Sequence, residues 1–197
     1  MKRGIVLFLV VMMLLSLPEY VFAEGESGLN WKDLGPFVEE AFGDEAHFHA
    51  LSEVEAKIWI PDFLEEMKLT EEDREQGIIA SFMSEDETSA IYVNYSDLEG
   101  LPLESFQSHL EQTGVPSYFE KTNGIRTLLY YDGKSDVLIA NYETVDGYYL
   151  QVMFFPYSDE TVSLLTSFVL SSIQPDVQET KEPVAAPLHP VSSLIVK

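Results

Sequence analysis

Between residues 118 and 155, short β-rich runs alternate with turn dipeptides. The dipeptides are Asn123-Gly124, Asp132-Gly133 and Asp146-Gly147. Asn-Gly and Asp-Gly suit hairpin turns because both residues tolerate positive φ. Strand-length runs flank each turn, at 118–122, 125–131, 137–144 and 148–155. Three such turns in succession predict an antiparallel meander.

The rest of the chain alternates between strand and helix periodicity. We expect two more strand pairs, 47–51 with 55–60 and 78–83 with 90–95. Apolar residues at helical spacing predict helices over 31–42, 102–113 and 159–172, the last of them capped by Ser158. Asp62 can cap a single helical turn through Met67, and Thr70 can begin a short helix that ends at Gly77.

The run 148–155 indicates how the sheet is covered. Its alternate positions make one face of Tyr148, Leu150, Val152 and Phe154, and the other of Tyr149, Gln151, Met153 and Phe155. Both faces are partly apolar, which suits a sheet covered at least partly on both sides. We therefore predict an α+β fold, with an antiparallel β-sheet and helices packed on its faces as an α/β/α sandwich.

Four phrases carry a resemblance to a known fold: AKIWIP (56–61), IIASFMSEDETSAIYVNY (78–95), LPLESFQSHLEQTG (101–114) and YYLQVMFFPYSDE (148–160). Their order resembles the PsbP-like sandwich fold over residues 46–174. The chain is also similar to uncharacterised small exported proteins of Gram-positive gut bacteria. The resemblance implies a non-enzymatic accessory protein that binds other proteins or assists assembly. No position matches a metal or partner motif of the family, so it implies no functional residue.

The two ends predict export and a tail. Lys2 and Arg3 precede an apolar run over 5–17, and Ala23 offers a small residue for cleavage, which is typical of a signal peptide over 1–23. The alternative is a retained membrane anchor, but the run is shorter than the roughly 20 residues of a spanning helix. We expect a secreted bacterial protein with a lead-in and helix at 24–45, one domain at 46–174, and a disordered, proline-rich tail at 175–197.

The net charge limits the kinds of partner that the chain can bind, and the cysteine content limits its chemistry. The chain has 34 acidic and 11 basic residues, and loss of 1–23 would leave 33 and 9, a net charge of −24. Such a surface repels phosphate backbones and anionic lipid, which argues against nucleic acid and against a stable membrane attachment after cleavage. The chain has no cysteine, which excludes thiol catalysis and thiolate metal sites.

His47 and His49 are the most suggestive pair for chemistry. At i and i+2 on a strand they share a face, which can suit a metal, with Glu45 or Glu53 as a further ligand. A small metal-dependent hydrolase is therefore the alternative function. No nucleophile motif, Walker loop or dinucleotide fingerprint occurs, so we expect no catalytic residue, no metal and no cofactor.

Aromatic residues crowd the meander. Tyrosine is a common strand residue, and it is also enriched where proteins recognise partners. The sequence favours an exported binding or accessory domain that acts on a protein or peptide. Its candidate binding residues are Trp59, Tyr130, Tyr142 and Tyr149.

Overall fold

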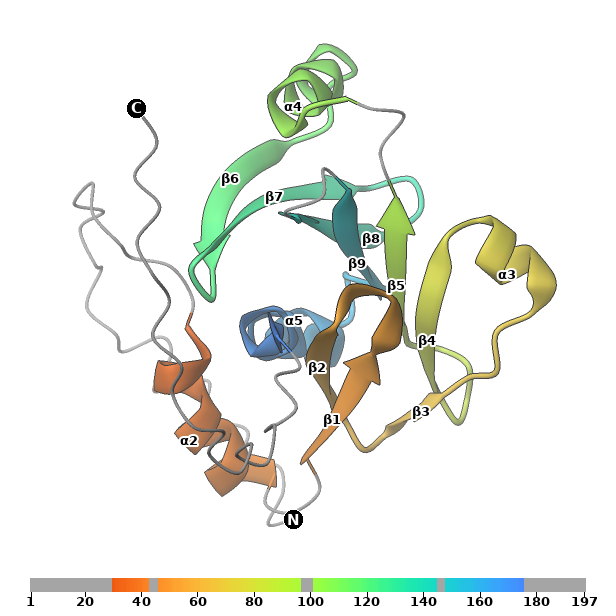
Figure 1. Cartoon of the computed structure of the whole chain (residues 1–197), viewed down its shortest axis with the longest axis vertical. Helices are drawn as coiled ribbons and strands as arrows, with labels where there is room; N and C mark the ends of the chain where they lie inside the picture. Colours follow the sequence, from red (N-terminus) through yellow and green to blue (C-terminus); the bar gives the residue numbers. More distant parts are fainter. Residues whose placement is uncertain (1–29, 43–45, 97–100, 145–147, 176–197) are drawn as a thin grey trace, which may run out of the picture.

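A computed structural model describes residues 30–42, 46–96, 101–144 and 148–175, and the predicted meander forms its centre (Figure 1). Adjacent meander strands pair antiparallel in chain order: β6 (Ser117–Thr122), β7 (Ile125–Asp132), β8 (Val137–Glu143) and β9 (Tyr149–Phe155). Asn123 and Gly124 both have positive φ at the first turn, as predicted. The third turn lies outside the described residues.

The meander extends into a seven-stranded antiparallel sheet. Strand β9 pairs with β5 (Ala90–Ser96), which pairs with β4 (Ile78–Ser84), and β4 pairs with β3 (Leu64–Glu66). The strand order is β3-β4-β5-β9-β8-β7-β6. This sheet, with helices packed on it, confirms the predicted α+β class.

The early hairpin forms a second, smaller sheet. Strands β1 (Ala46–Leu51) and β2 (Ala56–Pro61) pair as predicted, and the two-residue β10 (Gln174–Pro175) pairs with the free side of β2. The third strand of this sheet depends on a contact between residues more than 100 positions apart, which local sequence patterns do not reveal.

The helices divide between the two sides of the large sheet. Helix α4 (Leu103–Gln112) and helix α5 (Glu160–Ser172) lie on opposite sides of β7 (Figure 1). Helix α5 contacts both β9 and β2, and α2 (Trp31–Phe42) packs on α5 and β1. The short α3 (Glu71–Glu75) adjoins β4 and begins at Thr70, whose side chain makes a capping box with Asp73. Helix α5 is thus covered by strands on two sides and by α2.

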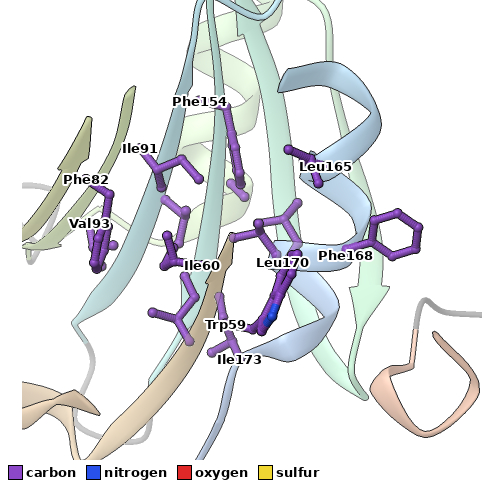
Figure 2. Close-up of a cluster of buried hydrophobic side chains, with 14 of the residues drawn as sticks. Trp59, Ile60, Phe82, Ile91, Val93, Phe154, Leu165, Phe168, Leu170 and Ile173 are labelled. Carbon is purple, nitrogen blue, oxygen red and sulfur yellow. The ribbon is translucent and has the colours of Figure 1, made fainter. Parts of the chain in front are cut away.

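The main core fills the space between the large sheet, α5 and β2. Figure 2 shows Trp59 and Ile60 of β2, Leu170 of α5 and Phe154 of β9 within this buried cluster. The Trp59 side chain is fully buried, and its ring lies 6.0 Å from that of Trp31 in α2. A buried side chain of this size contributes about 3 kcal/mol or more, because truncating it leaves a large cavity. Trp59 therefore holds α2 and β2 to the rest of the fold.

Two local predictions are wrong. Residues 64–66 form β3 instead of a helical turn, because Leu64 is buried and its strand pairs with β4, whereas an isolated helical turn is unstable. Asp159, not Ser158, caps α5: its carboxylate accepts hydrogen bonds from the Thr161 and Val162 amides. The predicted signal peptide and almost all of the predicted tail lie outside the described residues.

Candidate functional site

The large sheet leaves half of one face open. Cross-strand pairing places Tyr130, Ile139, Met153 and Tyr92 side by side on β7, β8, β9 and β5. Phe155 and Met83 extend the same face toward β4, through their shared neighbour Ala90. We call these six residues the sheet patch: Met83, Tyr92, Tyr130, Ile139, Met153 and Phe155. Phe155 is 38% exposed and the other five are partly exposed.

Helix α4 covers the other half of this face. Leu103 and Leu110 pack in a buried cluster with Leu128 of β7 and Tyr149 of β9. The Phe106 ring meets the Tyr130 ring edge-on at 5.6 Å, so Tyr130 marks the boundary between the covered half and the sheet patch. Helix α4 packs on this side of the sheet, whereas α5 packs on the other side and carries α2 on its outer surface (Figure 1).

An ion pair fixes α4 against the meander. The guanidinium of Arg126 donates to the Glu104 carboxylate at 2.6 Å and lies 3.8 Å from the centre of the Phe119 ring. The pKa of Glu104 is lowered by a backbone hydrogen bond and by Arg126. Both charged side chains are solvent-exposed, so the pair orients the helix more than it stabilises the fold.

A row of amides separates the sheet patch from the opposite end of the face. Asn141, Gln151 and Asn94 are cross-strand neighbours on β8, β9 and β5. The Gln151 side-chain amide donates to Asn141 at 2.6 Å, and Asn141 donates to the Leu128 carbonyl at 3.3 Å. Asn94 donates to the Gln76 carbonyl at 2.9 Å. These bonds hold polar groups in fixed positions along one border of the apolar surface.

Acidic side chains border the sheet patch near the β4–β5 turn. Glu65 is the cross-strand neighbour of Met83 on the same face, and Glu85, Asp86 and Glu87 form the turn that follows β4. All four are exposed. Hydrogen bonds from Ser84 and Thr88 lower the pKa of Asp86. At neutral pH the sheet patch therefore adjoins fixed negative charge.

The structure places the four aromatic candidates from the sequence in two environments. Trp59, Tyr142 and Tyr149 are buried, and the Tyr142 hydroxyl donates to the Leu170 carbonyl at 3.0 Å. Their rings pack the interior and present almost no surface to a partner. Tyr130 belongs to the sheet patch, and its partial burial raises its pKa to about 12.

The other five members of the sheet patch were not singled out from the sequence. The alternation in 148–155 already puts Met153 and Phe155 on one face with Tyr149 and Gln151. That pattern cannot show which part of the face α4 covers. Each of five strands contributes only one or two members of the sheet patch, so the strand order is needed to bring them together.

The histidine pair does not assemble a metal site within the described residues. His49 Nδ1 lies 3.4 Å from the Glu66 carboxylate, and the imidazole packs edge-on against Phe82. No group of three potential metal ligands occurs in the described part of the chain, and the side chain of His47 lies outside it. His49 joins β1 to the edge of the large sheet.

None of the helices in the described ranges is long and apolar enough to cross a bilayer. Together, the fold and the sheet patch define a class of protein. It is a small α+β domain whose central sheet is covered on one face and is covered over only half of the opposite face.

The chain resembles the solution structure of cyanobacterial PsbP (CyanoP) from Synechocystis sp. PCC 6803, with a TM-score of 0.47 and 11% sequence identity. The match covers 66% of this chain and 92% of that one. No protein-family model matches the sequence. No curated protein matches it either.

Proposed function

We propose that this chain is an exported, non-enzymatic binding domain that docks a segment of another protein on the sheet patch. The observation that carries the proposal is a contiguous apolar surface on an ordered sheet. The six apolar or aromatic side chains of the sheet patch come from the adjacent strands β4, β5, β9, β8 and β7. Each of them keeps part of its surface in contact with solvent.

The contrast between the two sheet faces supports a docking role. On the α5 side, residues such as Phe82, Val93 and Phe154 are fully buried. On the opposite side, α4 buries Leu128 and Tyr149 but leaves the sheet patch partly exposed. Contiguous exposed apolar surface on a soluble domain commonly marks an interaction site. Its tyrosine and methionine content also fits, since these residues are enriched in interface cores.

The overall charge supports a protein partner over a nucleic acid. With a net charge of −23, the chain repels a phosphate backbone. A protein segment can supply both apolar side chains for the sheet patch and charges that complement the acids beside it.

Site-specific photocrosslinking tests this proposal. The photoreactive residue p-benzoylphenylalanine replaces Phe155 in the sheet patch or, as a matched control, Phe37, which is 50% exposed on α2 at the opposite side of the large sheet. In the native producing cell we expect a defined protein adduct from position 155 and not from position 37. The adduct should disappear when Met153→Lys is added to the same chain.

Equal crosslinking from both positions, or an adduct that survives Met153→Lys, would show that the contact is not made by the sheet patch. No protein adduct from position 155 would reject the proposal. Circular dichroism of each variant confirms that the chain is folded in every arm.

A further inference from the structure

We infer that the segment docked on the sheet patch is a basic amphipathic helix of the partner protein, an inference that rests on the proposed function and specifies its ligand. Three observations lead to it: the patch lies on a sheet face and not at a sheet edge, acidic groups adjoin it, and its width matches a short helix.

Because the sheet patch lies on a sheet face, a helical ligand suits it better than an extended one. The backbone groups of β5, β9, β8 and β7 are already paired with neighbouring strands. An extended peptide lying on the face would find side chains but no backbone partners for its own N–H and C=O groups, which are costly to leave unpaired. A helix satisfies those groups internally and offers one apolar stripe. Helix α4 already packs on the adjoining half of the same face in this way.

The negative charge next to the sheet patch favours a basic helix. The segment 62–87 contains ten acidic and two basic residues, and four of these acids, Glu65, Glu85, Asp86 and Glu87, border the sheet patch. Glu65 lies directly beside Met83, and Glu85 and Glu87 lie at the adjoining turn. Lysine or arginine flanking an apolar stripe would complement these groups and speed association.

The same charge disfavours a second copy of this chain as the occupant. Two copies would each bring a net charge of −23 and would place acidic groups close together. Like charges facing each other across an interface oppose association. A partner of opposite charge avoids this penalty.

The dimensions set the length of the helix. The sheet patch spans β4, β5, β9, β8 and β7. Four gaps between strands, each ~4.8 Å, give a width of about 19 Å. A helix rises ~1.5 Å per residue, so about 13 residues, between three and four turns, cover that width.

Titration with synthetic peptides tests the inference on the full chain. The probe is a Leu/Lys peptide of about 14 residues with leucines along one helical stripe. Two comparison peptides are its Leu/Glu counterpart and a scrambled Leu/Lys peptide with no stripe. We expect the striped basic peptide to bind at least about tenfold more tightly than either comparison, a difference of about 1.4 kcal/mol.

Variants locate the binding. We expect Met153→Lys to weaken binding of the striped basic peptide by about tenfold or more, as for a central interface residue. Phe37→Lys adds the same charge on α2 and should change the affinity by less than about twofold. Met83→Lys is the second patch variant if Met153→Lys does not fold. Neutralising the acids with Glu65→Gln, Glu85→Gln and Glu87→Gln should weaken binding and reduce its salt dependence, while Asp86 is left in place because Ser84 and Thr88 bond to it.

The outcomes separate this inference from the proposed function. Binding of the acidic peptide as tightly as the basic one, with loss in Met153→Lys, would overturn the charge requirement and leave docking on the sheet patch intact. Equal binding of the striped and scrambled basic peptides would overturn the helix requirement. Absence of binding by all three peptides would reject the inference, while the photocrosslinking result would decide the proposed function independently.

Discussion

Individual hydroxyl groups join elements that are far apart in the chain. Ser172 Oγ at the end of α5 accepts a hydrogen bond from the Trp59 amide of β2 at 2.8 Å and donates to the Val169 carbonyl at 2.6 Å. The neighbouring Ser171 Oγ donates to the Phe168 carbonyl at 2.9 Å. Both serines are fully buried. Because the two hydroxyls have different hydrogen-bond partners, we expect their substitution to lower the free energy of unfolding by different amounts.

Ser172→Ala should destabilise the fold by about 1–3 kcal/mol, because it removes the acceptor of a buried backbone N–H. Ser171→Ala is the matched control, since its hydroxyl bonds only within its own helix, and it should cost less than about 1 kcal/mol. Urea unfolding of the two variants gives the comparison. Equal losses would contradict the role assigned to the Ser172–Trp59 bond.

The hydrogen bonds to Asp136 predict that part of the stability of the fold is lost at acidic pH. The Asp136 carboxylate accepts hydrogen bonds from the Ser158 hydroxyl, the Tyr131 hydroxyl at 2.9 Å and the Ser158 amide at 3.0 Å. Its pKa is lowered, chiefly by the Ser158 hydroxyl. A lowered folded-state pKa adds stability that is present above the unfolded value of about 3.9 and is lost as the pH falls through the folded value.

We therefore expect Asp136→Asn to be less stable than the wild type at pH 7 and to lose less stability on acidification. Glu111→Gln removes an exposed acidic charge from α4 and serves as the control. Unfolding free energies measured between about pH 7 and about pH 2.5 test this, a range that spans carboxylate titration. An unchanged slope below the ordinary aspartate pKa would contradict the assignment.

At the scale of elements, α5 depends on being covered from several directions. The large sheet, β2 and α2 all pack against it, so its buried residues are not confined to one stripe. Helix α2 completes this cover through Trp31, whose ring contacts Trp59 and meets Phe48 edge-on at 5.5 Å. The Trp31 ring also lies over Gly35 of its own helix.

Gly35→Ala should weaken the attachment of α2. An added Cβ would lie 2.9 Å from Trp31 Nε1, and contacts with Trp59 and Phe48 restrict the movement of that ring. We expect a loss of roughly 1–3 kcal/mol despite the better helix propensity of alanine. Gly133→Ala, whose Cβ would have 3.4 Å to its nearest neighbour, is the matched control. Near-ultraviolet circular dichroism and urea unfolding report the change; equal stability of the two variants would refute the tight contact.

Most helices, strands and turns could be predicted from the sequence because short runs of neighbouring residues determine them. The Asn123-Gly124 turn, the Thr70 cap and the stop at Gly77 depend on a few neighbouring residues, and the structure confirms them. The pairing of β10 with β2 and the extent of α4's cover depend on contacts across the whole chain. For that reason the sequence marked Trp59 and Tyr142 as readily as Tyr130, although only Tyr130 lies on the open face.

For the whole molecule, the proposed role requires export. The apolar run over 5–17 and Ala23 predict cleavage that would leave an acidic chain without cysteine. N-terminal sequencing of material recovered outside the cytoplasm should begin at Glu24. Recovery of a membrane-attached chain that still carries residues 1–23 would contradict cleavage and support a retained anchor.

Nuclear magnetic resonance of the labelled full chain, titrated with the striped basic peptide, tests whether the sheet patch is the binding surface. We expect the largest amide shift changes on β4, β5, β9, β8 and β7 around Met153, with little change in α2. Changes centred on α2 and β1, or spread evenly over acidic residues of the whole surface, would contradict the assignment of the sheet patch as the binding surface.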